Sequence, residues 1–237
     1  MAHLLEVAGL QAWYGESHVL HGVDMHVDEG EMVTILGRNG MGKTTTLRSI
    51  MGIVRQRRGE IRFDGADLMR VPLHHVARKG LGYVPEERGI FATLTVHENL
   101  MLPPDVSKDA KGEGMKLDEI YELFPNLYER RASFGTRLSG GEQQMLAVAR
   151  ILRTGVRAML LDEPTEGLAP VIIQRIGEML QTLRKRGMTV ILVEQNFRFA
   201  AKVTDRFYVM DHGKMIAHLP ASELEANMPM LHEVLGV

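Results

Sequence analysis

Residues Gly37–Thr44, which read Gly-Arg-Asn-Gly-Met-Gly-Lys-Thr, have the composition and spacing of a loop that wraps around phosphate groups. The glycines let consecutive backbone N–H groups face an anion, and a helix expected to begin at Gly42 adds the positive end of its dipole. Lys43 supplies a point charge for the β- and γ-phosphates, and the Thr44 hydroxyl can ligate Mg²⁺. These features predict binding of a nucleoside triphosphate, MgATP above all. The expected phosphate-binding residues are Gly37, Arg38, Asn39, Gly40, Gly42, Lys43, Thr44 and Thr45.

Two adjacent carboxylates, Asp162 and Glu163, follow the apolar run Ala158–Leu161. The carboxyl ends of strands are where α/β sheets bind ligands. Asp162 suits the coordination shell of Mg²⁺, and Glu163 can polarise a water molecule for attack on the γ-phosphate. By itself the pair is equally compatible with a solvated turn. Together with the phosphate loop it predicts hydrolysis of the nucleotide.

A third candidate is Leu138–Gln144, which precedes a run with helical spacing of apolar residues. Ser139 followed by Glu142 has the pattern of a capping box, so one interpretation is simply the start of a helix. The same helix start presents free backbone N–H groups and a positive dipole end to an anion. Two phosphate-binding helix starts in one chain suggest a nucleotide held between two protomers.

The elements that must position these residues are those of an α/β fold. Alternating apolar residues in Leu5–Leu10 and Val19–Val27 predict two strands of an antiparallel layer, joined across Tyr14 and Gly15. Short apolar runs predict further strands at Met32–Leu36, Ile61–Phe63 and Leu81–Val84. The runs Ala158–Leu161 and Thr189–Val193 are nearly all apolar, as expected for parallel strands covered on both faces. A stripe at helical spacing predicts a helix that buries Ile172, Ile176, Met179, Leu180 and Leu183.

The segment from Thr95 to Leu138 has a different character, because it contains helical patches and loops but no strand pattern. Val96–Met101 and Lys116–Phe124 are separated by two prolines and a polar stretch. We therefore expect a single domain over residues 1–237, with a core formed by 1–94 and 154–237. Residues 95–153 form an inserted helical subdomain that carries Ser139.

Composition narrows the possible functions. The 237 residues are 45% hydrophobic and 24% charged, as in ordinary globular proteins, and the absence of cysteine excludes disulfides and thiolate catalysis. A net charge of −2 gives no support to nucleic-acid binding. The start Met1–Glu6 does not have the pattern of a signal peptide, and no apolar run approaches the roughly 18 residues that span a bilayer. We expect a soluble chain that reaches a membrane only through a partner.

In the order of its three motifs the chain resembles the ATP-binding subunits of ABC transporters over nearly its whole length. Leu138–Gln143 is similar to the LSGGQ-type signature of that family, with Glu142 in an extra position found in one branch. The resemblance implies that Gly37–Thr44 is the Walker A loop and Met159–Glu163 is Walker B, with Glu163 as catalytic base. It also implies that Tyr14 stacks on adenine, whereas residue type alone equally allows a half-buried strand-end tyrosine. In the head-to-tail dimer of the family, the second protomer's Ser139, Gly140, Gly141 and Glu142 would contact the nucleotide.

Three positions differ from the usual family pattern. Glu86 stands where the family usually has a glutamine that contacts Mg²⁺ and water, and Gln195 where it usually has a histidine that touches the γ-phosphate. Ala169 replaces a usual aspartate. Gln195 can donate a hydrogen bond to phosphate but cannot carry a proton, and Glu86 adds negative charge beside the phosphates. The resemblance still implies that Glu86 and Gln195 occupy catalytic positions. It implies weaker ATP hydrolysis at this chain's own site, with nucleotide binding unchanged.

Three segments, Val84–Glu86, Glu163–Pro170 and Val193–Asn196, resemble one of two paired ATPases in bacterial importers of branched-chain amino acids. A related group serves urea and short amides. This resemblance implies a second ATPase subunit, identical or different, integral membrane permease subunits, and indirectly a periplasmic or extracellular solute-binding protein. It places the chain in the cytoplasm, on the inner face of the cell membrane, and implies no nucleic-acid partner.

Two other functions remain as alternatives. A soluble ABC-type ATPase acting on DNA or the ribosome usually has a long coiled-coil insertion or a second ATPase domain, and neither is apparent in the sequence. A simple P-loop kinase would leave Leu138–Gln144 unexplained.

Overall fold

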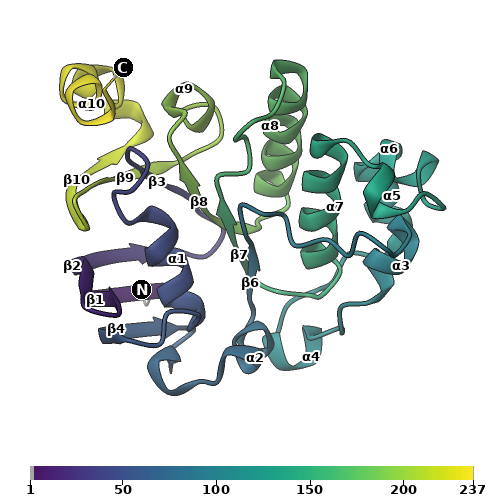
Figure 1. Ribbon diagram of the computed structural model, residues 1–237, viewed down its shortest axis with the longest axis horizontal. Coiled ribbons are helices and arrows are strands. Elements are labelled where there is room, and N and C mark those ends of the chain that lie inside the picture. Colours follow the sequence, from purple (N-terminus) through teal and green to yellow (C-terminus); the bar gives the residue numbers. More distant parts are fainter. Residues whose placement is uncertain (1–2, 237) are drawn as a thin grey trace.

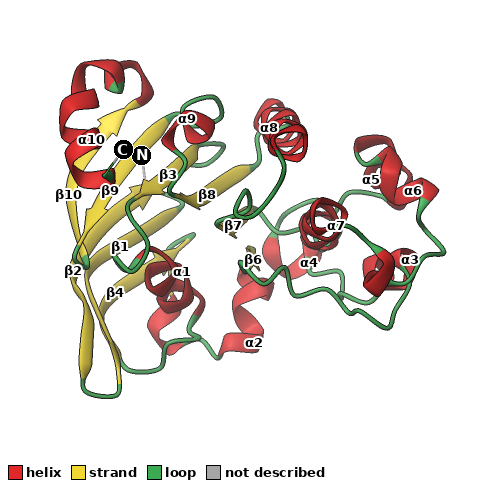
Figure 2. Cartoon of the chain, turned by 45° about the horizontal axis from the view of Figure 1, so that its top comes forward, coloured by secondary structure: helices red, strands yellow, loops and turns green. Residues whose placement is uncertain are grey.

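The computed structural model describes residues 3–236, so the part of the N-terminal expectation that concerns Met1 and Ala2 lies outside the described residues. The strands form two sheets, a six-stranded one that we call the central sheet and a four-stranded antiparallel one (Figures 1 and 2). The strands are β1 Leu5–Tyr14, β2 Ser17–Val27, β3 Met32–Leu36, β4 Arg57–Phe63, β5 Ala66–Asp67, β6 Leu81–Val84, β7 Ala158–Asp162, β8 Thr189–Glu194, β9 Arg206–Asp211 and β10 Lys214–Pro220. The α-helices are α1 Lys43–Met51, α2 Leu73–Val76, α3 Val96–Met101, α4 Ser107–Ala110, α5 Leu117–Leu123, α6 Pro125–Glu129, α7 Gly140–Leu152, α8 Pro170–Lys185, α9 Phe197–Ala200 and α10 Met228–Leu235.

The central sheet has the strand order β10-β9-β3-β8-β7-β6, in which all neighbours are parallel except β9 and β10. Its middle strands are buried on both faces. In β7, Ala158 and Leu160 pack into one hydrophobic cluster, and Met159 and Leu161 pack into another on the opposite face. This confirms the predicted parallel strands covered on both sides. The carboxyl ends of β3, β7 and β8 therefore meet at one edge of the sheet.

The antiparallel sheet has the order β2-β1-β4-β5, and its predicted hairpin is confirmed, although both strands are longer than expected. They turn between Tyr14 and Ser17, where Gly15 adopts a positive φ of 60°. Helix α1 lies between this sheet and the central one, because Leu47 and Ile50 belong to the same hydrophobic cluster as residues of β1, β2, β3 and β8. Burial on two sides fixes the start of α1 relative to both sheets.

Between β6 and β7 the chain forms helices α3 to α7, joined by loops. The predicted helix Val96–Met101 is confirmed residue for residue, and the one predicted over Lys116–Phe124 is observed as α5. In Figures 1 and 2, α3, α5 and α6 lie on the far side of α7 from the antiparallel sheet. The boundaries of a separate subdomain at 95–153 stay a prediction.

The last part of the chain holds elements that the sequence did not predict, namely β9, β10, α9 and α10. They enclose a third hydrophobic cluster, which includes Phe207 and Val209 of β9 and Leu231 and Leu235 of α10. Within residues 3–236, no helix combines the length and hydrophobicity that crossing a bilayer requires.

Candidate nucleotide-binding site

The phosphate loop connects the end of β3 to the start of α1, as predicted, and two of its glycines are required by close packing. A Cβ atom at Gly37 would lie 2.6 Å from the carbonyl oxygen of Met210. Gly42 has a φ of 106°, and a Cβ there would lie 2.8 Å from Cδ2 of Leu20. Any larger residue would push the loop away from β2 and β9. The glycines therefore fix the loop against the sheets as well as leaving room for an anion.

Lys43 connects the phosphate loop to the acidic end of β7. Only 3% of the residue is exposed, and its Nζ donates to the carbonyl oxygen of Arg38 at 3.0 Å and approaches Oδ1 of Asn39 at 3.5 Å. The same Nζ lies 3.0 Å from Oε1 of Glu163. The two candidates separated by 120 positions in the sequence thus form one buried ion pair. An ammonium held this way faces the position where the loop would receive phosphates.

The second contact between the loop and the strand end is a pair of oxygens. Thr44 donates its hydroxyl to Oδ1 of Asp162 at 2.8 Å, and Tyr83 of β6 donates to Oδ2 at 2.9 Å. Burial raises the pKa of Asp162, while these two hydrogen bonds oppose the rise. Mg²⁺ prefers oxygen ligands and commonly takes one or two from the protein with the rest from water and phosphates. Thr44 and Asp162 fit that requirement and would hold the ion, which neutralises phosphate charge when bound.

Glu163 occupies an unusual backbone conformation directly after β7. Its φ is 45°, in the left-handed region that residues other than glycine seldom adopt, and its N–H donates to the carbonyl oxygen of Val193 at 3.0 Å. Backbone strain of this kind is concentrated at functional sites. A hydrogen bond with the Glu163 carboxyl raises the pKa of nearby Glu166, and burial adds to the rise. The turn therefore holds Glu163 beside Lys43 and a second carboxyl group.

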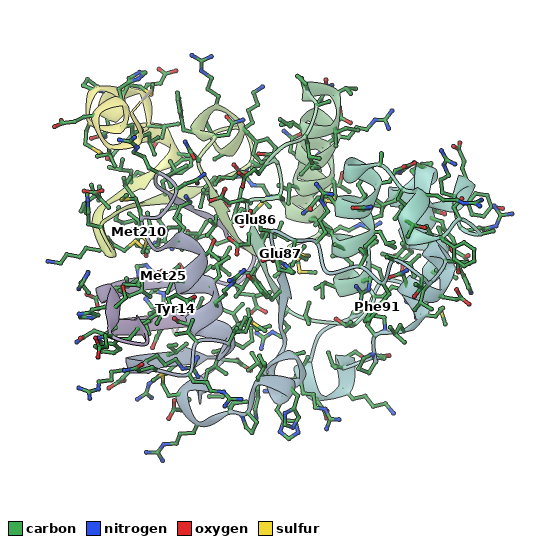
Figure 3. The ribbon with its side chains drawn as sticks, viewed as in Figure 1. Tyr14, Met25, Glu86, Glu87, Phe91 and Met210 are labelled. Carbon is green, nitrogen blue, oxygen red and sulfur yellow. The ribbon has the colours of Figure 1, made fainter. Side chains whose placement is uncertain are left out.

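The remaining predicted catalytic residues lie around the same carboxylates. Local desolvation, followed by the charges of Glu163 and Asp162, raises the pKa of Glu86, so this carboxyl group shares their electrostatic environment. Figure 3 shows Glu86 in the middle of the molecule, beside Glu87. Gln195 lines a cavity of about 510 Å³ together with Glu163. The catalytic and metal-binding roles of Glu86 and Gln195 stay predictions.

Tyr14 lies at the end of β1 and is 48% exposed (Figure 3). Close to half of the residue is accessible at the end of the strand, so its position is compatible both with stacking on a base and with a half-buried strand-end tyrosine. Its contact with adenine stays a prediction.

The capping box at the start of α7 is present as predicted. The Ser139 N–H donates to Oε2 of Glu142 at 2.7 Å, and the Glu142 N–H donates to Oγ of Ser139 at 3.3 Å. In the described part of the chain, no hydrogen bond or ion pair joins residues 139–142 to residues 37–45. The views in Figures 1 and 2 both show α7 well apart from α1. Within one chain, the structure brings together the first two motifs and leaves the third separate.

Packing gives Gly141 a role that does not depend on any ligand. A Cβ atom there would lie 2.4 Å from Cγ2 of Ile172 on α8. At Gly140 it would meet only the flexible ends of Arg88 and Leu168, at 3.2 and 3.3 Å. Both substitutions to alanine gain the same helix propensity. We therefore expect Gly141→Ala to be less stable than Gly140→Ala by about 1–3 kcal/mol, the cost of overpacking a fitted contact.

Urea unfolding of the two variants measures this difference, with Gly140→Ala as the matched control. Adding Ile172→Ala should cost less in the Gly141→Ala background than in the wild type, because it removes the atoms that clash. Equal unfolding free energies for the two glycine variants would contradict the packing role.

Some residues whose hydrogen bonds stabilise this site were not predicted from the sequence. Tyr83 supports Asp162, and Thr165 and Glu194 form a buried hydrogen bond of 2.7 Å beside Glu163. Tyr83 lies in the predicted strand that pairs with β7, so its position was a usable signal. Glu194 ends β8 after four apolar residues, and an acidic residue at the end of a buried strand was the corresponding signal there.

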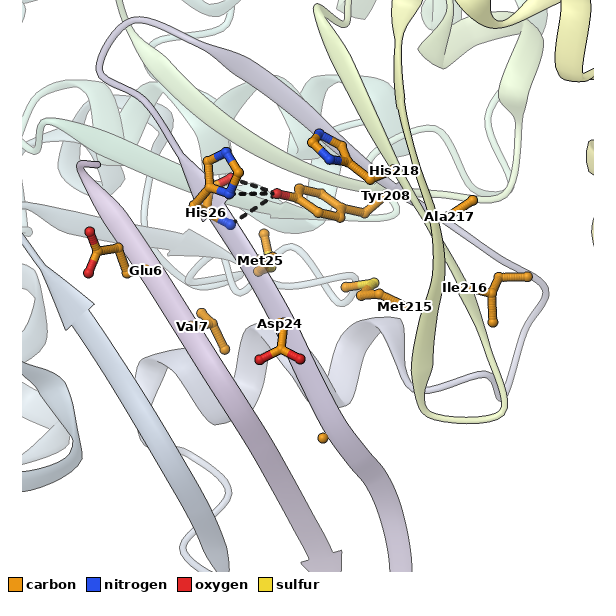
Figure 4. A pocket seen from close by; sticks show the side chains of 11 residues that line it. Glu6, Val7, Asp24, Met25, His26, Tyr208, Met215, Ile216, Ala217 and His218 are labelled. Carbon is orange, nitrogen blue, oxygen red and sulfur yellow. Dashed lines mark hydrogen bonds between the residues drawn. The ribbon is translucent and has the colours of Figure 1, made fainter. Parts of the chain in front are cut away.

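A second cavity of about 510 Å³ lies away from these motifs, between β2 and the strands β9 and β10 (Figure 4). Arg206, next to it, donates to both carboxylate oxygens of Glu31 at 2.7 Å and to the hydroxyl of Tyr208 at 2.7 Å. It also donates to the backbone carbonyl oxygen of His26 at 2.9 Å and contacts the imidazoles of His26 and His218. These groups tie the two sheets together, and none of the predicted site residues lies here.

Comparison with known proteins agrees with this arrangement. The family model described as "ABC transporter" matches residues 20–166. The high-affinity branched-chain amino acid transport ATP-binding protein BraG of Pseudomonas aeruginosa is 40% identical over 98% of this chain and 100% of that protein. The lipopolysaccharide export system ATP-binding protein LptB of Haemophilus influenzae is 38% identical over 90% of this chain and 89% of that protein. A nucleotide-free ATP-binding cassette from an ABC transporter shares the fold, with a TM-score of 0.83 at 23% identity over 98% of both chains.

Proposed function

Because this chain belongs to the ABC transporter family and is an ATP-hydrolysing enzyme of transport, we propose that it powers an importer of branched-chain amino acids. The observation that carries the enzymatic part is the contact between the phosphate loop and the end of β7. Lys43 lies 3.0 Å from Glu163, and Thr44 lies 2.8 Å from Asp162. A charge for the phosphates, an oxygen pair for Mg²⁺ and a candidate base thus converge at one edge of the sheet.

In the proposed mechanism the chain's own residues bind, orient and deprotonate. The loop N–H groups and Lys43 hold the β- and γ-phosphates, and Tyr14 stacks on the base. Glu163 accepts a proton from the water that attacks the γ-phosphate. Gln195 donates a hydrogen bond toward that phosphate, and Glu86 lies beside the attacking water and the ion.

We further propose that a second ATPase subunit completes the site. The start of α7 offers Ser139, Gly140 and Gly141 to a nucleotide, yet it makes no bond to the phosphate loop within residues 3–236. In a head-to-tail dimer this helix start would face the γ-phosphate bound by the other subunit. Permease subunits in the membrane would receive the resulting motion, and a solute-binding protein would deliver the solute to them.

The proposed solute rests on the 40% identity with BraG along the full length of both proteins. It also rests on the three segments around Glu86, Glu163 and Gln195 that resemble ATPases of branched-chain amino-acid uptake. Urea or a short amide is the alternative within import. Lipopolysaccharide export is a second candidate, supported by the 38% identity with LptB.

Transport by the purified assembly tests the proposed solute. The full-length chain is isolated with its membrane partners, reconstituted in proteoliposomes with the matching solute-binding protein, and supplied with MgATP. We expect accumulation of labelled leucine or isoleucine, no accumulation of urea, and none of either with Glu163→Gln. Co-purification of lipopolysaccharide-handling membrane subunits, or uptake of urea alone, would contradict the amino-acid assignment.

A further inference from the structure

A buried carboxyl group for which the sequence predicted no catalytic, nucleotide-binding or metal-binding role lies next to the candidate catalytic base. Glu194 is the last residue of β8 and is 3% exposed. Its Oε1 accepts from the hydroxyl of Thr165 at 2.7 Å and from the Thr165 N–H at 3.3 Å, and its Oε2 accepts from the Asn196 N–H at 3.3 Å. A carboxylate removed from water needs such donors. All three donors point at the carboxylate, so an ionised Glu194 stabilises the observed positions of Thr165 and Asn196.

The position of these contacts in the fold gives them a consequence. Asp162 of β7 pairs with Val193 of β8, and the Glu163 N–H donates to the carbonyl oxygen of Val193. Thr165 lies two residues beyond Glu163 in the same turn, so Glu194 anchors the turn from the neighbouring strand. The turn contains the strained backbone of Glu163, with its φ of 45°. A strained residue keeps its conformation only when the surroundings hold it.

We propose that Glu194 is a positioning residue, which holds the turn 163–166 through Thr165 and thereby aims the carboxylate of Glu163 at the γ-phosphate. This inference rests on the proposed role of Glu163 as base. Glu194 does not touch the nucleotide; it acts through Thr165. The same carboxylate also fixes Asn196, next to Gln195, so one group holds both loops that border the γ-phosphate site.

The charge of Glu194 is sensitive to pH near neutrality. Burial raises its pKa to about 7, against the three hydrogen bonds, and the nearby carboxylate of Glu163 adds to the rise. The other ionisable groups around the adjoining cavity are Glu166, Arg198 and His232. Protonation of Glu194 turns one acceptor oxygen into a donor that faces N–H or O–H groups. The hold on the turn should therefore loosen as pH falls through about 7.

Turnover is the first measurement, made on the full-length chain with its co-purified partners at saturating MgATP. An error of about 1 Å in the aim of a catalytic group costs up to about 100-fold, so we expect kcat to fall about tenfold in Glu194→Gln and in Thr165→Val. KM should change less than about twofold, because the phosphate loop is untouched. Thr165→Ser keeps the hydroxyl and should restore kcat. The double variant should lose no more than either single one, because both break the same contact.

The pH profile distinguishes positioning from a general structural role. Wild-type kcat should rise as pH passes through about 7, and this inflection should be absent in Glu194→Gln. Glu225→Gln, on the exposed surface, is the matched control and should keep the wild-type profile. Wild-type kcat and an unchanged inflection in Glu194→Gln and Thr165→Val would overturn the proposal, as would losses that multiply in the double variant.

A second measurement does not require turnover. Since the folded-state pKa of Glu194 lies above the unfolded value of about 4.3, the folded chain binds the extra proton, and Glu194 lowers stability as pH rises from about 4.5 to 7. The melting temperature of Glu194→Gln minus that of the wild type should therefore rise across this range. A flat difference would contradict a titrating, buried Glu194. If Glu163→Gln kept full turnover, the proposed function would fail instead, whatever Glu194 does.

Discussion

Replacing Lys43 with alanine is expected to lower the affinity for MgATP at least 100-fold and to reduce turnover below detection. Lys43 is buried, and its Nζ lies 3.0 Å from both the Arg38 carbonyl oxygen and Glu163. Hydrogen bonds to charged groups contribute about 1.5–3 kcal/mol each, and 1.4 kcal/mol corresponds to a factor of ten in affinity. Two contacts to phosphate oxygens account for the expected loss.

Calorimetric titration with a non-hydrolysable ATP analogue and Mg²⁺ measures this affinity, with Lys79→Ala as the control for an exposed lysine. Lys43→Arg keeps the charge but replaces a compact ammonium by a planar fork in a tight loop, so most of the affinity should still be lost. Glu163 would be left without its partner in Lys43→Ala, so unfolding of the nucleotide-free protein must be recorded as well. Affinity within threefold of the wild type would contradict the assignment of the loop.

Glu163→Gln is expected to lower kcat by about 100-fold or more while ATP binding is kept, since general base catalysis contributes about 10²–10⁴-fold. The substitution has the same shape and requires the same backbone at φ 45°, so the loss reports the charge of the side chain. With hydrolysis blocked, MgATP should accumulate in a closed pair of ATPase subunits.

Phosphate release and size-exclusion chromatography with MgATP test this pair of effects. Glu225→Gln, which removes a carboxylate from the exposed surface, is the control and should keep the turnover. Wild-type phosphate release by Glu163→Gln, with no MgATP-dependent association, would show that another group activates the water.

The convergence of the first two motifs was predictable because it follows from a general property of parallel sheets. Strands β3 and β7 were visible as apolar runs, and their carboxyl ends had to share one edge. The positions of Lys43 and Asp162 at those ends then placed them together. Helix α7 was predictable for a similar reason, since Ser139 and Glu142 carry the capping signal in adjacent residues.

The contacts behind the base were not predictable, because they depend on strand register. Glu194 reaches Thr165 because Asp162 pairs with Val193. The sequence alone does not specify which residues of the two strands pair. Strands β9 and β10 were not predicted either. The apolar run Phe207–Met210 of β9 was a usable signal, whereas in β10 His218, which contacts Arg206, interrupts the apolar residues.

The central place of β3 in its sheet also has a consequence for how the protein is made. The Thr34 hydroxyl of β3 contacts Thr204, 170 positions later, and β3 pairs with both β8 and β9. At about 5–20 residues per second, a nascent chain completes these partners on the order of 10–30 s after β3 has been synthesised. During that interval β3 has two unpaired hydrophobic edges, which are sites of misassociation. Chaperone protection of the growing chain should therefore matter most before β9 is available.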